Sequence, residues 1–306
     1  MFDSEIQGRS PRKRSRIRKA VYPVAGFGTR LLPATKTSPK EMLTLVDRPL
    51  IQHAVEEARD AGIEEHILVT ARGKEDLENH FDSAPALEAE LASQGKTDLL
   101  SRVREITLPS GSIAHVRQTE PKGLAHAIWC ARHLVRGEPF AVILPDDIIQ
   151  AARPCLEQMI EAADALPEDS VLMAVEDVPE DAIGRYGAVS IGNDDGRLVG
   201  VDGIVEKPEP GRAPSLTGVV GRYILSPDIM TRLEAAIAQQ DAEVMLTDIL
   251  SKKARLSGSV YGFRFHGTRH DCGSRQGYLR AIVSHALVHP ELGQDFRAWL
   301  EGMIER

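Results

Sequence analysis

The sequence predicts an α/β fold in which a mostly parallel β-sheet is covered by helices on both faces. Short apolar segments alternate along the chain with segments whose apolar residues recur at helical spacing. This alternation is typical of strand–helix–strand units, whose crossover helices bury both faces of a parallel sheet. The chain has 306 residues, 42% of them hydrophobic, which is enough for one large domain or two smaller ones.

The first half of the chain shows this alternation most clearly. Residues 20–24 are expected to form a strand that opens into a glycine-containing loop, and Pro49 suits the first turn of a helix that ends at Gly62. The other expected elements are strands at 67–69, 113–116 and 140–144, a polar helical stretch at 74–104 and a helix at 123–135.

The second half is less regular. We expect a helix at 154–165, strands at 171–175 and 219–225, a strand that ends at Glu206, and a helical tail with an apolar face from about residue 274. This tail is expected to pack on its own body or on another subunit. Because no repeat or linker interrupts the chain, residues 19–306 are predicted to be one domain that includes the tail.

The charge of the chain is unevenly distributed. Its formal net charge is −8, but residues 1–19 carry seven basic residues against Asp3 and Glu5, so this segment is +5 and the remainder is −13. An acidic body is a poor surface for nucleic acid, because phosphate binding needs a basic field. We interpret residues 1–18 as a flexible, solvated extension; binding of nucleic acid or anionic lipid is the alternative.

The cysteines indicate a reducing compartment. Cys130, Cys155 and Cys272 are spread over the chain without paired spacing, which favours neither a disulfide framework nor a cysteine zinc cluster. No segment approaches the about 20 apolar residues of a membrane span, and no signal-peptide core follows the basic segment. We therefore expect a cytoplasmic protein with no membrane partner.

A glycine-containing loop at residues 26–30 follows the first predicted strand. Its glycines would let backbone N–H groups approach a phosphate chain. Taken alone, such a loop is often only a tight turn, and its spacing matches neither the P-loop nor the dinucleotide fingerprint. Arg30 and Lys40 support the phosphate hypothesis, since two cations would neutralise a polyphosphate. Each cation alone is interpreted more simply as a surface charge.

Two aspartates, Asp146 and Asp147, follow the apolar strand at 140–144. Ligands bind at the carboxyl ends of parallel strands, and the glycine loop is expected at the same edge. Mg²⁺ prefers one or two carboxylates together with phosphate oxygens and water. A helix N-cap explains the aspartates equally well from local sequence. Asp271 is a second candidate ligand, with a turn as the alternative.

Three further segments carry polar groups of interest. Glu206 and Lys207 end a predicted strand, where they would face sugar hydroxyls and a sugar phosphate; an exposed pair before Pro208 is the alternative. The Gln118 amide would pair with a pyrimidine edge, although a glutamine there is more often a surface residue. A zinc site is not favoured, because its candidate ligands lie along one straight helix and do not converge; these are His126, Cys130 and His133.

Taken together, these segments resemble the sugar-nucleotide pyrophosphorylase family and, within it, the bacterial uridylyltransferase branch. The likeness runs from about Lys19 to the C-terminus. The first motif is typical of the whole family, whereas residues 78–82 and the Cys272-Gly273 ending are more typical of the branch. The matching segments are residues 23–36, 39–43, 46–52, 78–82, 117–118, 122–127, 142–147, 205–208, 220–223, 246–248 and 270–273.

The resemblance implies a Rossmann-like nucleotide-diphospho-sugar transferase fold and a Mg²⁺-dependent reaction. In that reaction an oxygen of glucose 1-phosphate attacks the α-phosphorus of UTP, which gives UDP-glucose and pyrophosphate. Such chemistry depends on positioning and charge neutralisation more than on covalent help from the protein. The family also implies a homo-oligomer, a dimer or a tetramer.

The resemblance also implies roles for individual residues. Backbone groups of Ala25, Gly26 and Gly28 would hold the nucleotide, and Gln118 with Gly123 would contact the uracil. Arg30 and Lys40 would neutralise the triphosphate. Asp146 and Asp271 would bind Mg²⁺. The sugar phosphate site would be formed by Tyr186, Gly187, Glu206 and Lys207, with Lys207 at the phosphate and Glu206 at the hydroxyls.

Two features depart from the family pattern. The basic extension has no counterpart in it, and Asp147 stands where related branches often have asparagine; we favour Asp146 as the metal ligand. A thymidylyltransferase acting on the same sugar phosphate is the nearest alternative function. A non-catalytic nucleotide-sugar-binding regulatory subunit is disfavoured, because the candidate phosphate and metal residues are all present.

Overall fold

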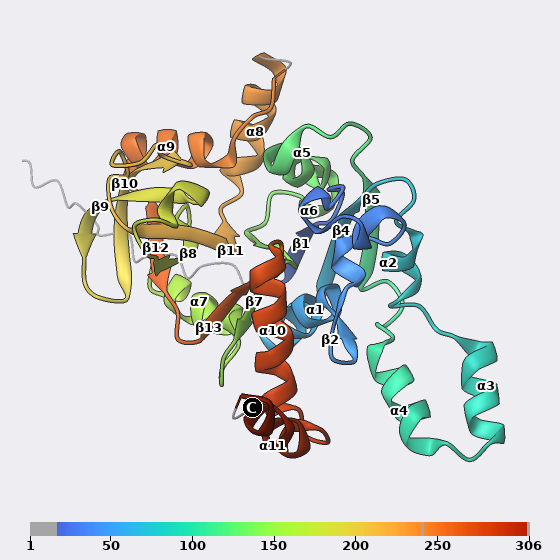
Figure 1. Cartoon of the computed structure of the whole chain (residues 1–306). Coiled ribbons are helices and arrows are strands. Elements are labelled where there is room, and N and C mark those ends of the chain that lie inside the picture. Colours follow the sequence, from blue (N-terminus) through green and yellow to red (C-terminus); the bar gives the residue numbers. More distant parts are fainter. Residues whose placement is uncertain (1–16, 240–241, 305–306) are drawn as a thin grey trace, which may run out of the picture.

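The computed structural model describes residues 17–239 and 242–304, and most of its strands form one large sheet (Figure 1). Within these residues, nine strands lie in the sheet in the order β5 (Ile113–Arg117), β4 (Glu65–Thr70), β1 (Lys19–Pro23), β6 (Phe140–Ile143), β11 (Thr217–Leu225), β8 (Val171–Asp177), β12 (Val260–Arg264), β10 (Leu198–Glu206) and β9 (Gly187–Asp194).

Helices cover both faces of this sheet (Figure 1). One face packs against α5 (Gly123–Cys130), α6 (Arg132–Val135), α8 (Asp228–Gln239) and α9 (Leu246–Ser257), and the other against α1 (Leu50–Asp60) and α7 (Cys155–Asp164). α2 (Glu75–Asn79) adds Leu77 to the second of these cores. Outside the two layers lie α3 (Pro85–Ser93), α4 (Thr97–Ile106), α10 (Arg275–Val288) and α11 (Gly293–Ile304). Four short 3₁₀ turns are η1 (Thr29–Leu31), η2 (Ala34–Lys36), η3 (Lys40–Met42) and η4 (Ile183–Arg185) among the described residues.

The central strands are apolar on both sides because each face of the sheet is buried. In β1, Val21 packs into the core under α5 and α8, whereas Ala20 and Tyr22 pack into the core under α1 and α7. In β6, Val142 and Ile143 divide between the two cores in the same way. Successive side chains of a strand point to opposite faces, so such continuous apolar runs are expected of strands buried on both sides.

The expected mixed sheet with helices on both faces is confirmed, and its parallel pairings are concentrated in the first half of the chain. β1 is parallel to β4 and β6, and β4 is parallel to β5. In the second half only β8 and β12 are parallel, while β11 runs antiparallel to β6 and β8, and β9 runs antiparallel to β10. The short β9–β10 connection permits this hairpin, whereas parallel neighbours need long crossovers.

Several predicted helices are interrupted. The stretch at 74–104 is three helices, since Pro85 begins α3 and Gly95, at φ +67°, separates α3 from α4. Proline cannot continue a preceding helix, and glycine adopts this left-handed conformation without a steric cost. The helix predicted at 123–135 is α5 and α6 with Ala131 between them, and the C-terminal tail is α10 and α11.

Two short pairs of strands lie outside the main sheet: β2 (Thr44–Leu45) with β3 (Arg48–Pro49), and β7 (Asp147–Gln150) with β13 (Thr268–Asp271). Asp147 therefore begins a strand and does not cap a helix. The β7–β13 pair, called the ribbon below, continues beyond the carboxyl end of β6 and leads into α10 (Figure 1). The ribbon thus connects the edge of the sheet where we expected ligands to the C-terminal helices.

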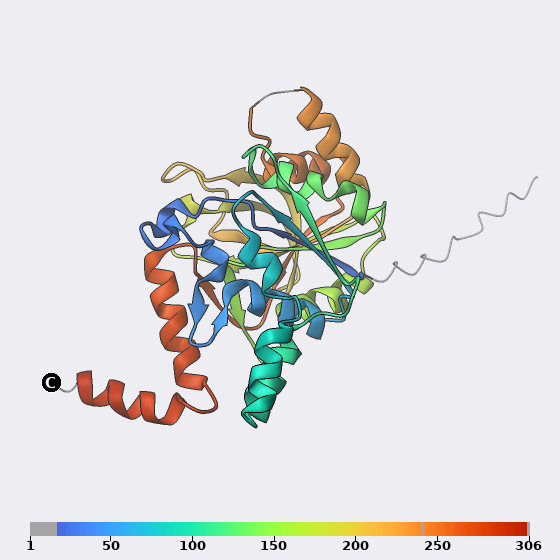
Figure 2. The same ribbon diagram turned by 90° about the vertical axis from the view of Figure 1, so that its right-hand side faces the viewer.

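The first and the last described residues contact the body differently. Residues 1–16 of the predicted extension lie outside the described residues, Ile17 is buried in the core, and Arg18 donates a hydrogen bond to Glu64. At the other end, α10 packs through Ala281 while α11 extends away from the sheet (Figure 2). In the part of the chain that the structure describes, no helix has the length and apolar character needed to cross a membrane.

A buried ion pair fastens α1 to the sheet. Arg222 on β11 is fully buried, and its Nη2 donates to Glu57 Oε2 at 2.8 Å while its Nη1 donates to the carbonyl oxygens of Leu144 and Gly221. Glu57 Oε1 also accepts from the backbone N–H of Leu156 in α7. One carboxylate and one guanidinium therefore join α1, α7, β6 and β11.

Arg222→Met is expected to lower the free energy of unfolding by about 3–5 kcal/mol, because it leaves Glu57 buried without its cation. Urea denaturation followed by circular dichroism measures this loss. The matched control is Arg153→Met, since Arg153 forms only exposed ion pairs with Glu157 and Glu161 and should cost about 0–1 kcal/mol. Equal losses in the two variants would contradict the importance of the buried pair.

Candidate functional site

A cavity of about 830 Å³ lies at the carboxyl end of β6, between the ribbon and strands β9 to β11. Its lining combines carboxylates, cations and apolar walls. Eight of the residues singled out from the sequence line it: Arg30, Asp146, Asp147, Tyr186, Gly187, Glu206, Lys207 and Asp271. Chain segments that are far apart in the sequence thus meet at the sheet edge where the strand pattern placed a ligand site.

Both candidate metal ligands line this cavity, and the part of the wall that they form is called the metal end below. The ribbon pairs Asp271 with Asp147, and the backbone N–H of Cys272 donates to the carbonyl oxygen of Asp146 at 2.7 Å. The carboxylate of Asp146 also lies against Gly273, where an added Cβ would be 2.7 Å from Oδ2. Glycine at 273 therefore keeps this space open beside the two aspartates.

The donor set suits a hard cation. No group of three or more histidine, cysteine, aspartate or glutamate side chains in the described ranges is arranged to hold a metal ion. A metal here would be held by Asp146 and Asp271, with its remaining positions left for phosphate oxygens and water. Mg²⁺ prefers such partial protein coordination.

Cations surround Asp146. Lys40 Nζ donates to Asp146 Oδ2 at 2.6 Å, and Arg30 Nη2 lies 3.6 Å from the same oxygen. Burial favours the neutral acid, but these two cations outweigh it, and the pKa of Asp146 is lowered from its ordinary value. Burial likewise disfavours the Lys40 cation, yet the neighbouring Asp146 raises the Lys40 pKa. Both groups are therefore charged at neutral pH.

Asp147 is engaged by the protein itself. Its Oδ2 accepts from the backbone N–H of Gly221 at 2.9 Å, and its Oδ1 accepts from Arg269 at 2.7 Å. Because both oxygens already have protein donors, this geometry favours Asp146 over Asp147 as the carboxylate available to a metal ion.

The glycine loop lies beside Lys40. Gly28 has φ +66°, and a Cβ there would lie 3.0 Å from Lys40 Cβ, so a side chain at 28 would be both strained and crowded. By contrast, a Cβ at Gly26 would meet no atom within 4 Å. The backbone around Gly26 thus faces open space, as an approach to phosphates requires, and Ala25 is partly exposed next to it.

Two buried charges that the sequence analysis missed hold this loop. Lys74 Nζ donates to the carbonyl oxygen of Val24, immediately before the loop, and to Glu41 Oε2 at 3.0 Å. Glu41 is fully buried next to Lys40; burial raises its pKa, and burial lowers the pKa of Lys74. Lys74 looked like a surface residue at a helix start, so only the position of Glu41 inside a matched motif could have indicated this role.

Gln118 and Gly123 lie together, beside the main cavity but outside its lining. Gln118 is buried, and its Nε2 lies within hydrogen-bonding distance of the Gly123 carbonyl oxygen, at 3.0 Å, and of His126 Nδ1, at 2.9 Å. Gly123 has φ +79°, and the Glu243 carboxylate lies where a Cβ would project. As described, the cavity lining includes Leu124 and Glu243 but neither Gln118 nor Gly123.

The candidate sugar residues line the same cavity, and the part of the wall that they form is called the sugar end below. The β9–β10 register pairs Gly187 with Glu206, and the backbone N–H of Lys207 donates to the carbonyl oxygen of Tyr186 at 2.9 Å. Lys207 Nζ lies 3.6 Å from Glu206 Oε1, and its side chain is 64% exposed. Thr247, which lies in a matched segment but was given no role, lines the same wall, and its buried Oγ1 has no hydrogen-bond partner among the described residues.

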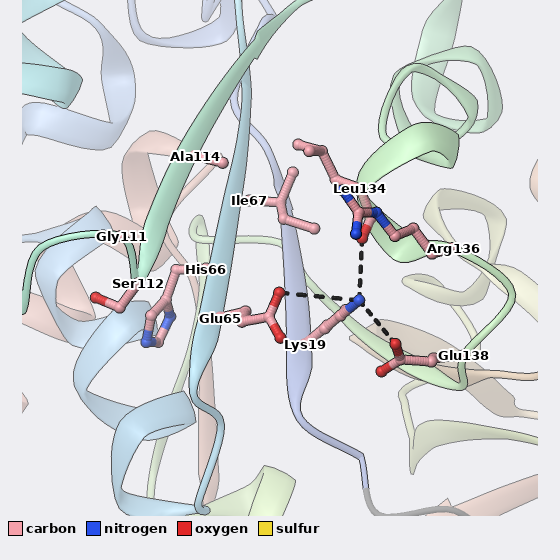
Figure 3. Close-up of a pocket in the computed structure, with 10 residues that line it drawn as sticks. All are labelled: Lys19, Glu65, His66, Ile67, Gly111, Ser112, Ala114, Leu134, Arg136 and Glu138. Atoms are coloured by element: carbon pink, nitrogen blue, oxygen red, sulfur yellow. Dashed lines mark hydrogen bonds and ion pairs between the residues drawn. The ribbon is translucent and has the colours of Figure 1, made fainter.

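A second cavity, of about 270 Å³, lies at the opposite edge of the sheet around Lys19 (Figure 3). Lys19 Nζ donates to Glu138 Oε1 at 3.0 Å and to the carbonyl oxygens of Leu134 and Val135 at the end of α6. This cation is buried and paired at the end of a helix, so it stabilises the protein. Arg30 and Lys207 of the larger cavity are, in contrast, largely exposed.

Comparisons with known proteins agree with this geometry. The model of the nucleotidyl transferase family matches residues 19–286. The UTP–glucose-1-phosphate uridylyltransferase of Bacillus subtilis (strain 168) is 41% identical over 95% of this chain and 98% of its own length. The protein of the same name from Komagataeibacter xylinus is 45% identical over 85% of this chain and 90% of its own length.

Solved structures agree as well. A UDP-glucose pyrophosphorylase from Acinetobacter baumannii superposes with a TM-score of 0.86 at 40% identity, covering 94% of this chain and 99% of its own. A UTP-bound UGPase from the same organism gives a TM-score of 0.85 at 41% identity, covering 93% and 98%. The resemblance and the expected fold are therefore confirmed, and the chain belongs to the nucleotidyl transferase family, in the branch of the bacterial UTP–glucose-1-phosphate uridylyltransferases.

Proposed function

We propose that this enzyme transfers the uridylyl group of UTP to glucose 1-phosphate and releases pyrophosphate. The observation that carries the proposal is that one cavity combines two sets of candidate residues. Asp146, Asp271 and Arg30 line it together with Glu206 and Lys207. Relatives that cover nearly the whole chain are named for this reaction, and a similar solved structure is described as bound to UTP.

The reaction exchanges one bond at phosphorus for another. An oxygen of glucose 1-phosphate forms a bond to the α-phosphorus of UTP while the bond to the leaving pyrophosphate breaks. In this proposal Lys40 and Arg30 neutralise the triphosphate and the departing pyrophosphate, and Lys207 holds the attacking phosphate. Mg²⁺, when bound by Asp146 and Asp271, would supply further charge neutralisation and a template for the phosphates.

The Lys40–Asp146 pair links nucleotide binding to the charge of the site. A triphosphate offers Lys40 a second anionic partner, and a divalent cation offers Asp146 a second cationic partner. If only the triphosphate bound to Lys40, or only the metal ion to Asp146, the other member of this ion pair would lose part of its charge compensation. When both bind, Lys40 and Asp146 each keep a partner of opposite charge. UTP is therefore proposed to bind together with its metal ion.

The C-terminal helices support the proposal of a homo-oligomer, a dimer or a tetramer. α11 extends away from the sheet (Figure 2). Large apolar side chains are exposed on α10, on α11 and in the turn between them. A second copy of the chain would cover such a surface, which monomeric proteins rarely expose. These side chains are Leu279, Val288, Leu292, Trp299, Met303 and Ile304. A cytoplasmic location is proposed on the three free thiols, Cys130, Cys155 and Cys272.

The purified protein is expected to release pyrophosphate from UTP only when glucose 1-phosphate and Mg²⁺ are both present. With dTTP, kcat/KM should be lower than with UTP by a factor of about ten or more, because the base methyl and the missing 2′-hydroxyl both change contacts in the pocket. A coupled pyrophosphate assay over a panel of nucleoside triphosphates and sugar phosphates measures this. Faster turnover of dTTP would identify a thymidylyltransferase.

Lys207→Ala should raise KM for glucose 1-phosphate by about 10–100-fold and leave KM for UTP within about twofold. The reason is that a charge-assisted hydrogen bond to phosphate contributes about 1.5–3 kcal/mol. Steady-state kinetics with each substrate varied separately gives both constants. Lys252→Ala, at an exposed position on α9, is the control. An equal rise in both KM values would refute the assigned role.

Asp146→Asn should increase the Mg²⁺ concentration needed for half-maximal activity by about tenfold or more, because the metal loses one of two anionic ligands. Asp164→Asn, an exposed substitution at the end of α7, should leave it unchanged. Calorimetric titration of UTP with and without Mg²⁺ provides a readout separate from turnover. A variant whose Mg²⁺ dependence matched the parent would exclude Asp146 as a ligand.

A further inference from the structure

Arg269, in the wall of the large cavity, donates hydrogen bonds to three other side chains. It lies on β13 two residues before Asp271, so both side chains are on the same face of that strand. Its side chain is only 7% exposed and it lines the cavity. Nothing in its local sequence distinguished it, and only its alternation with Asp271 could have drawn attention to it.

The guanidinium has partners on three separate elements. Nε donates to Asp147 Oδ1 at 2.7 Å on β7, and Nη1 donates to Glu176 Oε1 at 2.7 Å on β8. Nη1 also donates to the hydroxyl oxygen of Tyr186 at 3.0 Å, and the guanidinium carbon lies 5.1 Å from the centre of that ring. Tyr186 directly follows η4 and lines the sugar end of the cavity.

These contacts connect the metal end of the cavity to its sugar end. The metal end is also held without Arg269, by the β7–β13 backbone pairing and by the hydrogen bond from the Cys272 N–H to the Asp146 carbonyl oxygen. The Tyr186 hydroxyl, in contrast, accepts its hydrogen bond from Arg269 among the described residues. Loss of the guanidinium should therefore affect the Tyr186 side chain more than the candidate metal ligands.

The geometry requires a guanidinium. Its donors diverge in one plane, so one side chain can satisfy Asp147, Glu176 and Tyr186 at once. A lysine ammonium at 269 would carry the same charge but lacks this planar fork. Because Arg269 also pairs with Asp147, the Asp147 carboxylate is engaged by the protein and differs in this from Asp146.

We propose that Arg269 is a positioning residue for the acceptor sugar, which acts by fixing the Tyr186 ring against the sugar end of the cavity. This inference rests on the proposed function, because it assigns the acceptor to that end. Arg269 then affects binding of the glucosyl group, while the nucleotide end is held by Lys74, Glu41 and Lys40 on other elements.

The test is a double-mutant cycle of Arg269→Lys and Tyr186→Phe. Each single variant should raise KM for glucose 1-phosphate about tenfold and leave KM for UTP within about twofold. Because the two residues act through one contact, the double variant should be no worse than the more affected single variant. The inference would be overturned if the KM increases of the two single variants multiplied in the double variant, or if KM for UTP rose as much as KM for glucose 1-phosphate.

Controls separate positioning from general damage. Tyr261→Phe makes the same chemical change on β12, away from the cavity lining, and should leave both KM values unchanged. Tyr186→Phe removes one hydroxyl and keeps the ring, so it tests the contact even if Arg269→Lys fails to fold. Circular dichroism and thermal unfolding of each variant check the fold.

A binding measurement distinguishes failure of this inference from failure of the proposed function. Calorimetric titration should show that Arg269→Lys weakens binding of UDP-glucose about tenfold and that of UTP less than about twofold. Unchanged UDP-glucose affinity would overturn the role of Arg269 whatever the turnover. A parent protein that does not turn over UTP with glucose 1-phosphate would instead refute the proposed function.

Discussion

The pairing of β13 with β7 is the constraint on which the candidate site depends. It brings Asp271 and Arg269, from near the C-terminal end of the domain, to the carboxyl end of β6, where Asp146 lies. The hydrogen bond from the Cys272 N–H to the Asp146 carbonyl oxygen then fixes the two aspartates relative to one another. Without this ribbon, each aspartate would be an isolated carboxylate on its own loop.

Charge compensation explains why so many ionisable groups are tolerated in this region. An unpaired buried charge is costly, but each buried carboxylate here has a nearby cation. Lys40 faces Asp146, Arg269 faces Asp147, and Lys74 faces Glu41. These pairs leave the cavity lined with groups of fixed charge and orientation, which is the preorganisation that phosphoryl transfer requires. The cations near the opening, Arg30 and Lys207, remain more exposed and available to substrates.

The fold class was predictable because it follows from local patterns. Residues 140–144 are apolar throughout because β6 is buried on both faces, and a run of this kind can be recognised without knowing its neighbours. The positions of helix breaks were less predictable. Pro85 and Gly95 divide one polar helical stretch into three helices, and both residues were visible in the sequence although their effect was not anticipated.

The sequence by itself determined the α/β class, the placement of the glycine loop and Asp146 at one edge of the sheet, and, through its motifs, the family. These depend on periodicity and on short segments, which are properties of neighbouring residues. Only the tertiary structure decided that Asp147 is engaged by Arg269, that Lys74 holds the loop before Gly26, and that Gln118 lies outside the main cavity. Those outcomes depend on contacts between residues far apart in the chain, whose partners no local pattern specifies.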